Sequence, residues 1–444
     1  MRAMKHSPLI FLQLNEVNFD FVEHYVRKYN DMPAFARLLN TFQKIETRGE
    51  EAYEELEPWI QWVSAQTGKT YAEHGVFRLG DVVKAPTDLV QVFEALEERG
   101  LRVGAISPMN ARNRLKRPAY FIPDPWTDTP ADASGFSTRL SAMLRQTVNE
   151  NASGRISARS VLTLLEALVY SFSFRGTSDL IQAIAATRRQ PWTKALVLDR
   201  LIHLVHLKLW QRQRPDVSFV FLNAGAHIQH HYMFNAEPAS AQSRNPAWYV
   251  PADADPVRDM LRAYDRILGD YLGLLKSGTR VLIATGLTQV PYDRVKFYYR
   301  LKNHFEFLKL IETIPVRVLP RMTRDFEIEF ANEAHAAHAV EQLAALKLER
   351  DSRPVFGEID RRGTQVFATL TYPDEIRPSD ALVRSNGDRL QDFGTMVSFV
   401  AIKNGMHSTR GFAFLSPNAP VPLRLDGPCH VARLFDVALS VATQ

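Results

Sequence analysis

The chain has 444 residues, of which 45% are hydrophobic and 23% are charged, and its formal net charge is +5. This composition is typical of a globular protein with a large core and excludes a disordered chain. A single cysteine, Cys429, excludes an intramolecular disulfide and a cysteine-rich zinc site. No stretch of 18 uncharged apolar residues is present, so we expect no transmembrane helix and a cytoplasmic protein.

The positive charge is concentrated in one segment. Residues 137–215 contain twelve Lys and Arg against four Asp and Glu, a net charge of +8. Such a segment attracts an anionic partner, either a small molecule or glycan substrate or a membrane surface contacted peripherally. The structural alternative is a solvated face of extra helices. We expect no nucleic-acid binding, because no module of interleaved basic and aromatic residues is visible.

The first half of the chain alternates between apolar runs and helical spacing. Residues 8–14 predict a buried strand, and residues 19–40 predict helical structure interrupted near Pro33. A further helix is predicted to begin at Pro58 and to end at Gly68. The other predicted elements here are a helix at 89–98, a strand at 102–106, an ordered loop at 118–129, and amphipathic helices at 160–173 and 193–211.

The second half continues this alternation and then changes character. Strands are predicted at 217–222 and 280–284, on either side of a helix at 256–276. Residues 315–373 instead predict strands at 316–319, 326–330, 355–360 and 365–371 around a helix at 332–346. Strands at 397–402 and 412–415 and a helix at 431–442 end the chain.

This pattern predicts an α/β fold with a doubly wound, mainly parallel sheet. We expect a core with its first part at 1–136, a basic helical insertion at 137–215 and a second core part at 216–314. A small α+β subdomain at 315–376 and a C-terminal core part at 377–444 complete the chain.

Polar side chains follow several of the predicted strands. Because the carboxyl ends of parallel strands meet at one edge of a sheet, we expect these side chains to converge on one crevice. Glu57 joins them, since it stands directly before the helix that begins at Pro58. The other members of the expected site are Asn15, Glu16, Asn223, His227 and His407.

In their order and spacing, these motifs resemble the alkaline phosphatase superfamily, and most of all its nucleotide pyrophosphatase/phosphodiesterase branch. The segment from Pro58 to Gly75 is similar to the nucleophile helix of that family, and Tyr120–Trp126 is similar to a loop of the branch. Asn223 and His227 lie at the two positions of the family's Asp-x-x-x-His ligand pair, with Asn in place of the Asp. His407 lies at the position of the last histidine ligand. The resemblance implies an alkaline-phosphatase-like fold that acts on phosphoesters with two metal ions, usually zinc.

The departures from the family pattern change what is expected of the site. The nucleophile position falls on Pro58 or Glu57, Asn15 replaces the first Asp, and Gly286-Leu287 replace an Asp-His pair. The resemblance therefore implies at most one divalent ion, such as zinc, held weakly by His227 and His407 with Asn223, or no metal at all. Glu57 and Glu16 are the candidate catalytic carboxylates, and Asn15, Asn223 and Trp59 are the candidate substrate-binding residues.

Three functions remain open at this point. The first is a divergent hydrolase or transferase for a phosphoester, a phosphodiester or a related anionic substrate, including a nucleotide-sugar or glycan-linked one. The second is metal-independent glycan cleavage or transfer by Glu57 and Glu16. The third is a catalytically silent homologue that binds an anion or a partner, in which Glu57 only caps its helix. Independently of these three functions, Trp59 and Trp62 are expected to pack in the core, with a stacking wall for a sugar or a base as the alternative.

Overall fold

The computed structural model of the protein describes residues 7–149, 157–239, 243–320, 324–420 and 427–444. It consists of two compact units, which are Met1–Pro291 with Gly405–Gln444, and Tyr292–Asn404. Each unit has its own hydrophobic core. All the residues expected in the functional site belong to the larger unit.

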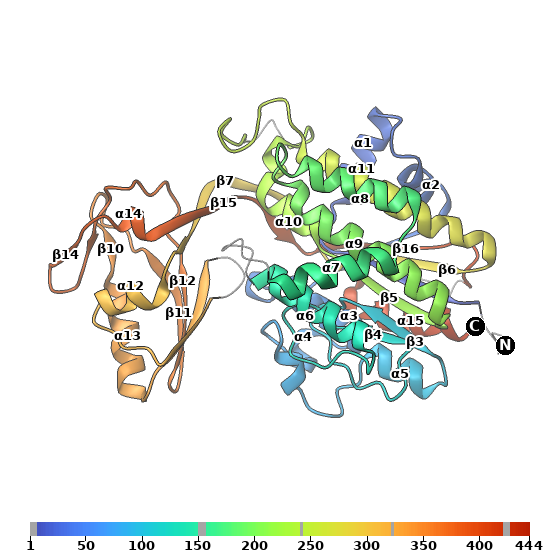
Figure 1. Ribbon diagram of the computed structural model, residues 1–444, viewed down its shortest axis with the longest axis horizontal. Coiled ribbons are helices and arrows are strands. Elements are labelled where there is room, and N and C mark those ends of the chain that lie inside the picture. Colours follow the sequence, from blue (N-terminus) through green and yellow to red (C-terminus); the bar gives the residue numbers. More distant parts are fainter. Residues whose placement is uncertain (1–6, 150–156, 240–242, 321–323, 421–426) are drawn as a thin grey trace. The chain divides into compact units, whose positions relative to one another are not determined.

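An eight-stranded sheet forms the centre of the larger unit (Figure 1). Its strands are β1 (Leu9–Leu14), β2 (Gln43–Arg48), β3 (Val103–Ile106), β4 (Tyr120–Ile122), β5 (Val217–Leu222), β6 (Arg280–Ala284), β16 (Arg410–Leu415) and β17 (Cys429–His430). Their spatial order is β17-β2-β16-β6-β1-β5-β3-β4, and neighbours from β6 to β4 run parallel. Only β16 runs antiparallel to its neighbours β6 and β2 among these described pairs. The predicted mainly parallel sheet is confirmed.

Helices cover both faces of this sheet, as a doubly wound fold requires. The side chains of β1 alternate, so that Leu12 and Leu14 enter one core cluster and Leu9 and Phe11 enter the other. The first cluster includes residues of α1 (Phe19–Lys28), α2 (Pro33–Thr41), α6 (Gly135–Asn149), α7 (Ala158–Tyr170), α8 (Phe174–Ala186), α9 (Thr193–Gln213), α10 (Ala224–Tyr232) and α11 (Pro256–Gly273). The second includes residues of α3 (Pro58–Thr67), α5 (Val92–Glu98) and α15 (Leu434–Thr443).

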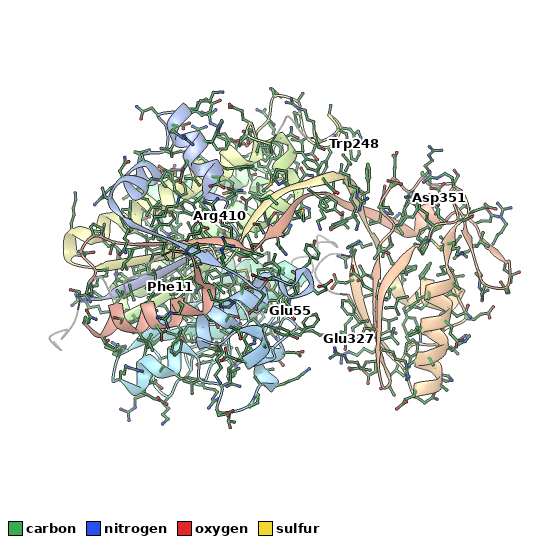
Figure 2. All side chains as sticks on the ribbon, turned by 180° about the vertical axis from the view of Figure 1, so that it is seen from behind. Phe11, Glu55, Trp248, Glu327, Asp351 and Arg410 are labelled. Carbon is green, nitrogen blue, oxygen red and sulfur yellow. The ribbon has the colours of Figure 1, made fainter. Side chains whose placement is uncertain are left out.

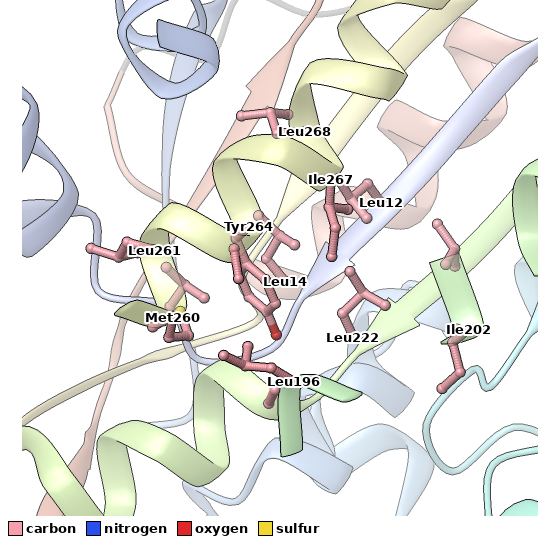
Figure 3. Packing of buried hydrophobic residues seen from close by; sticks show 14 of the residues in the cluster. Leu12, Leu14, Leu196, Ile202, Leu222, Met260, Leu261, Tyr264, Ile267 and Leu268 are labelled. Atoms are coloured by element: carbon pink, nitrogen blue, oxygen red, sulfur yellow. The ribbon is translucent and has the colours of Figure 1, made fainter. Parts of the chain in front are cut away.

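Close packing holds these layers together. Figure 3 shows Ile267 of α11 beside Leu12 of β1, and Tyr264 of α11 beside Leu14. Figure 2 shows Phe11 of β1 inside the larger unit and Arg410 on β16. The Arg410 guanidinium forms ion pairs with Asp20 of α1 and with Glu46 of β2. It therefore connects a helix and a neighbouring strand to β16.

The smaller unit is an α+β domain around a four-stranded antiparallel sheet, with the order β11-β12-β9-β8. The chain passes into it through β7 (Thr288–Leu301) and returns through β15 (Val397–Ser408). Its other elements are α12 (His304–Leu310), β8 (Arg317–Pro320), β9 (Asp325–Glu329), α13 (Glu333–Ala345), β10 (Lys347–Leu348), β11 (Phe356–Arg362), β12 (Gln365–Leu370), β13 (Leu382–Val383), β14 (Arg389–Leu390) and α14 (Phe393–Met396). The unit extends beyond the range 315–376 on both sides, because Tyr299, Leu301 and Phe393 belong to the same core.

Three strands of the main sheet lie where the sequence predicted none, and one of them is the two-residue strand β17. Residues 43–48 are mostly polar, but Ile45 and Thr47 of β2 point inward while their neighbours are more exposed. Residues 120–122 fall in the predicted loop, yet they form β4, a fully buried edge strand beside β3. In addition, none of the described helices combines the length and apolar character needed to cross a bilayer.

The contact between β3 and β4 gives a direct test of this packing. A Cβ atom on Gly104 would lie 2.4 Å from the ring of Tyr120. We expect Gly104→Ala to lower the free energy of unfolding by about 1–3 kcal/mol through overpacking. Urea denaturation measures this change. Gly273→Ala in α11 is the control, because no atom lies within 4 Å of its new methyl group. An equal loss in both variants would contradict the prediction.

Candidate metal centre

The site forms at the carboxyl ends of the central strands. Leu14 of β1 pairs with Leu222 of β5, so Asn15 and Asn223 follow neighbouring strand ends. The Asn15 Nδ2 donates to the Asn223 Oδ1 at 2.8 Å. Thr285 follows β6, and its carbonyl oxygen accepts a hydrogen bond from the Glu16 backbone N–H at 3.0 Å. Three strand ends therefore meet around Glu16.

Glu16, His230 and His407 form a cluster of three donor groups at this place. The Oε2 atom of Glu16 lies 3.1 Å from Nε2 of His230 and 3.2 Å from Nε2 of His407. The two Nε2 atoms lie 3.2 Å from each other. Within the described parts of the chain, this is the one group of three or more such side chains spaced to hold a metal ion.

Glu16 is held in an unusual backbone conformation. Its φ angle is 61°, in the left-handed region that residues other than glycine seldom adopt. Gln229 fixes this turn, because its Nε2 donates to the Glu16 carbonyl oxygen at 2.8 Å while its Oε1 accepts from the Asn18 N–H at 3.0 Å. The Glu16 carboxylate is fixed separately by Asn15 Nδ2 at 3.0 Å and by Gln289 Nε2 at 2.5 Å.

The Glu16 carboxylate is buried and remains ionised. Burial by itself raises the pKa of Glu16, because it penalises the charged form. The charges of His407 and His230, and the hydrogen bonds from both rings, outweigh burial and hold the pKa of Glu16 well below its usual range. An anionic oxygen therefore faces two imidazole nitrogens inside the protein.

The outer nitrogen of each histidine also has a neighbour. Nδ1 of His230 lies 3.4 Å from the Gly405 carbonyl oxygen, and Nδ1 of His407 lies 3.6 Å from Oε2 of Glu57. In metal sites, a ligating histidine almost always directs its other N–H to a carbonyl or a carboxylate, which fixes the ring and its tautomer. Both rings are therefore oriented with Nε2 toward Glu16.

The spacing of the three donor atoms fits a tetrahedral metal ion. Ligands at about 2.0 Å from a tetrahedral ion are about 3.3 Å apart, and zinc takes nitrogen and carboxylate oxygen at this bond length. The three separations of 3.1, 3.2 and 3.2 Å are close to that value. One carboxylate with two histidines is also a known donor set of catalytic zinc sites, where a fourth position stays open. The residues present fit one divalent ion.

Among the described residues, no second group of donor side chains is spaced to hold another ion. The Asn15 amide is fully hydrogen-bonded within the protein. Its Nδ2 donates to Glu16 and Asn223, and its Oδ1 accepts from the Trp62 Nε1 at 2.7 Å. Gly286 has a φ angle of 74°, and a Cβ atom there would lie 3.0 Å from the Trp62 ring. The indole therefore occupies the space that an acidic side chain at position 286 would need.

The structure distributes the predicted site residues differently from the motif pattern. Asn15, Glu16, Asn223, Glu57 and His407 do lie together. His227, predicted as a ligand, is exposed, and its ring contacts that of His231 at 4.7 Å rather than joining the donor cluster. The amide oxygen of Asn223, predicted as a further ligand, faces Asn15 instead.

Glu57 and the two tryptophans also have definite places. Glu57 precedes α3 but makes no capping hydrogen bond through its side chain, and its carboxylate lies near His407. Trp62 is fully buried, as the core interpretation predicted. Trp59 is half-buried against the same core, and its Nε1 donates to the Phe77 carbonyl oxygen at 3.0 Å. Both indole N–H groups are thus occupied within the protein.

The sequence suggested His230 or His231 only as neighbours of a His227 ligand, and it gave no sign of either glutamine. The segment from His227 to His231 contains three histidines, and the family pattern favoured the first of them. His230 lies three residues further along α10, one turn of helix away. Gln229 and Gln289 carry no motif; only their burial among polar groups shows their role.

Helix α10, which carries His230, is positioned by a buried carboxylate of α9. Asp199 accepts hydrogen bonds from the N–H groups of Asn223 at 3.2 Å and Ala224 at 2.8 Å, and from the Tyr264 hydroxyl at 2.6 Å. The Tyr264 oxygen in turn accepts from the Gly225 N–H at 2.8 Å. Two side chains from other helices therefore bind the first turn of α10.

The fold and the site together define an α/β protein with one metal-capable centre at the carboxyl ends of its central strands. No family model matches this sequence, and no curated protein sequence is similar to it. Solved structures that match include a phosphonoacetate hydrolase from Sinorhizobium meliloti 1021, with 12% identity and a TM-score of 0.41. That match covers 99% of this chain and 96% of the hydrolase.

Two further matches are human ectonucleotide pyrophosphatase/phosphodiesterase 5 and the alkaline phosphatase PafA. Their identities are 9% and 11%, both TM-scores are 0.44, and both matches cover 98% of this chain. They cover 94% and 95% of those chains, respectively. The likeness of this chain to all three proteins is distant.

Asp199 provides a pH test of how α10 is held. Burial raises the pKa of Asp199 to about 6, even though Tyr264, Ala224 and Asn223 donate to it. In the unfolded chain its pKa is about 4, so between these values the folded state binds more protons. The contribution of Asp199 to stability is therefore fully present below about pH 4 and falls by about 2–3 kcal/mol as the pH rises through 6.

Asp199→Asn removes this titration and keeps the shape of the side chain. We expect the difference in unfolding free energy between the natural protein and Asp199→Asn to shift in favour of the variant between pH 4 and pH 7. Urea denaturation at a series of pH values measures the difference. A difference that does not change with pH would contradict the prediction.

Proposed function

We propose that the chain is a hydrolase that uses one divalent metal ion, with zinc as the best fit, to cleave a phosphoester, phosphodiester or related anionic bond. The observation that carries this proposal is the triangle of Glu16, His230 and His407 donor atoms, with edges of 3.1–3.2 Å. The family resemblance of the motifs supports the choice of bond. A divalent ion held there would polarise a phosphoryl oxygen and lower the pKa of a water molecule bound to it.

The surrounding residues suit direct transfer to water. Glu57-Pro58 provides no hydroxyl or thiol at the start of α3, so no covalent phosphoryl intermediate is expected on this helix. Glu57 is placed to orient His407 through Nδ1 and is, in this proposal, a positioning residue. Because the Oδ1 atom of Asn223 faces Asn15, the Nδ2 group of Asn223 points away from Asn15. The Asn223 Nδ2 group has no hydrogen-bond acceptor among the described residues and would bind an anionic oxygen of the substrate.

The other two hypotheses have less geometric support. Glycan cleavage by two carboxylates needs both to act on the substrate, yet Glu16 is buried and its two oxygens already face Asn15, Gln289 and both histidines. A silent anion-binding protein does not need an ionised carboxylate between two imidazoles, and burying that carboxylate is costly unless the cost is compensated. A metal-dependent enzyme needs this arrangement, because the carboxylate and the two imidazoles are its metal ligands.

The ligand set can be tested by comparing two histidines on the same helix. His230→Ala should lose the bound metal and all metal-dependent turnover, because one of three ligands is gone. His227→Ala should keep on the order of one metal equivalent, since this residue lies outside the donor triangle. Elemental analysis after purification and reloading with zinc measures the metal, and aryl phosphodiester and phosphomonoester substrates report turnover.

The opposite result would restore the motif-based ligand set. If His227→Ala loses metal while His230→Ala retains it, the proposed centre is wrong. If zinc binds with the expected ligand dependence but no phosphate ester is cleaved, the metal centre stands and the proposed reaction is wrong. Unchanged turnover in a strong chelator would exclude the metal from the reaction altogether.

Glu57 provides a separate test of the outer shell. Glu57→Gln should weaken zinc binding by roughly 10- to 100-fold, the usual effect of removing a carboxylate that orients a ligating histidine. Competition with a chromogenic chelator measures the affinity. Glu55→Gln is the matched control, because it removes a nearby carboxylate that is not placed at His407. Complete loss of turnover with unchanged zinc affinity would instead make Glu57 a catalytic residue.

A further inference from the structure

The turn between α7 and α8 exposes an unusual set of apolar side chains. Phe174 is 88% exposed and Val169 is 79% exposed, and Phe172 between them is also exposed. The rings of Phe172 and Phe174 contact each other at 5.3 Å in an edge-to-face arrangement. Leu162 and Leu165 continue an exposed apolar stripe along α7 at helical spacing from Val169. We call Val169, Phe172 and Phe174 the apolar tip.

Arginines surround the apolar tip. Arg175 directly follows Phe174, and the Arg212 guanidinium of α9 lies 4.5 Å from the centre of the Tyr170 ring, next to Val169. Arg214 follows at the end of α9. Arg175, Arg212 and Arg214 are all exposed, and none has an acidic side chain within ion-pair distance in the described parts of the chain.

The acidic residues of these two helices do not offset this charge. Glu166 of α7 forms an ion pair with Arg139, and Asp179 of α8 lies 3.8 Å from Arg266. The apolar tip is therefore bordered by positive charge that no acidic side chain neutralises within the described protein. A symmetric contact with a second copy would place these arginines opposite one another, which like-charge repulsion disfavours.

We propose that the apolar tip with Arg175, Arg212 and Arg214 is a docking site for an anionic lipid bilayer. Exposed aromatic and aliphatic side chains enter the boundary between headgroups and acyl chains, while arginines bind the anionic headgroups. The complementary charge and the protruding phenylalanine pair fit this partner. This inference is independent of the proposed hydrolase function.

The position of the tip leaves the metal centre accessible. The start of α8 lies beside the C-terminal half of α9, because a Cβ atom on Gly176 would contact the Leu204 side chain. Helix α9 ends at Gln213, shortly before β5 begins at Val217. The tip therefore lies toward the amino ends of the central strands, whereas Glu16 follows a carboxyl end. A bilayer at the tip would not cover the metal centre.

Vesicle co-sedimentation tests the docking site with the full-length protein. We expect binding to phosphatidylcholine vesicles that contain phosphatidylserine, weakening with added salt, and little binding to phosphatidylcholine alone. A triple variant should lower the partition coefficient by on the order of a hundredfold, because each lost charge contributes roughly fivefold. The triple variant combines Arg175→Gln, Arg212→Gln and Arg214→Gln. Phe174→Ser should lower it by roughly tenfold, through the lost apolar contact.

Two matched variants provide the controls. Lys116→Gln with Arg117→Gln removes exposed charges elsewhere on the larger unit, and Ile314→Ser removes an apolar side chain that is 74% exposed on the smaller unit. Both should bind vesicles like the natural protein, and circular dichroism should show every variant folded. Failure to bind anionic vesicles at low salt, or equal binding by all variants, would overturn the proposal. So would a dimer in sedimentation velocity that Phe174→Ser dissociates, because the tip would then contact a second copy.

Discussion

The larger unit is organised around one buried charge. A carboxylate that loses its contact with water is costly unless opposite charge and hydrogen bonds replace the solvent. Glu16 obtains both from His230, His407, Asn15 and Gln289. Its left-handed backbone conformation requires the further support of Gln229. Side chains from the ends of β1 and β5, from β7 and from α10 therefore all serve this one carboxylate or its backbone turn.

This arrangement explains why several polar residues in the site are neutral. An acid at the position of Asn15 or Asn223 would place a second negative charge beside Glu16, and like charges in a buried site repel. Two amides instead form a hydrogen bond with each other and leave the carboxylate to the histidines. Trp62 packs against Gly286, where an acidic side chain would not fit, and its indole N–H donates to Asn15. The departures from the family motifs thus form one consistent set.

Most of the fold could be predicted from the sequence, because buried parallel strands and amphipathic helices have strong patterns. The β1, β5 and β6 segments are almost entirely apolar, with one polar residue each, and their order indicates where polar residues converge. The strand β2 escaped prediction because only Ile45 and Thr47 face inward. The smaller unit runs from Tyr292 to Asn404, so parts of its boundary strands β7 and β15 lie outside the segment 315–373 in which the sequence pattern changes.

The site was predictable as a location but only partly as a set of donors. Glu16 was visible as the residue next to a motif position, and His407 as part of one. The choice between His227 and His230 depends on how far α10 is rotated, and that rotation is set by Asp199 and Tyr264 from other helices. Such a long-range constraint leaves no local signal in the sequence.

The three donors also come from widely separated parts of the chain, and His407 alone follows His230 by 177 positions. An ion bound by them would act as a removable cross-link between the N-terminal strand, a middle helix and the C-terminal region. It would bind only after all three had come together, so its binding free energy would add to the folding free energy of the whole unit. The availability of metal would then regulate not only turnover but also how long the folded chain survives proteolysis.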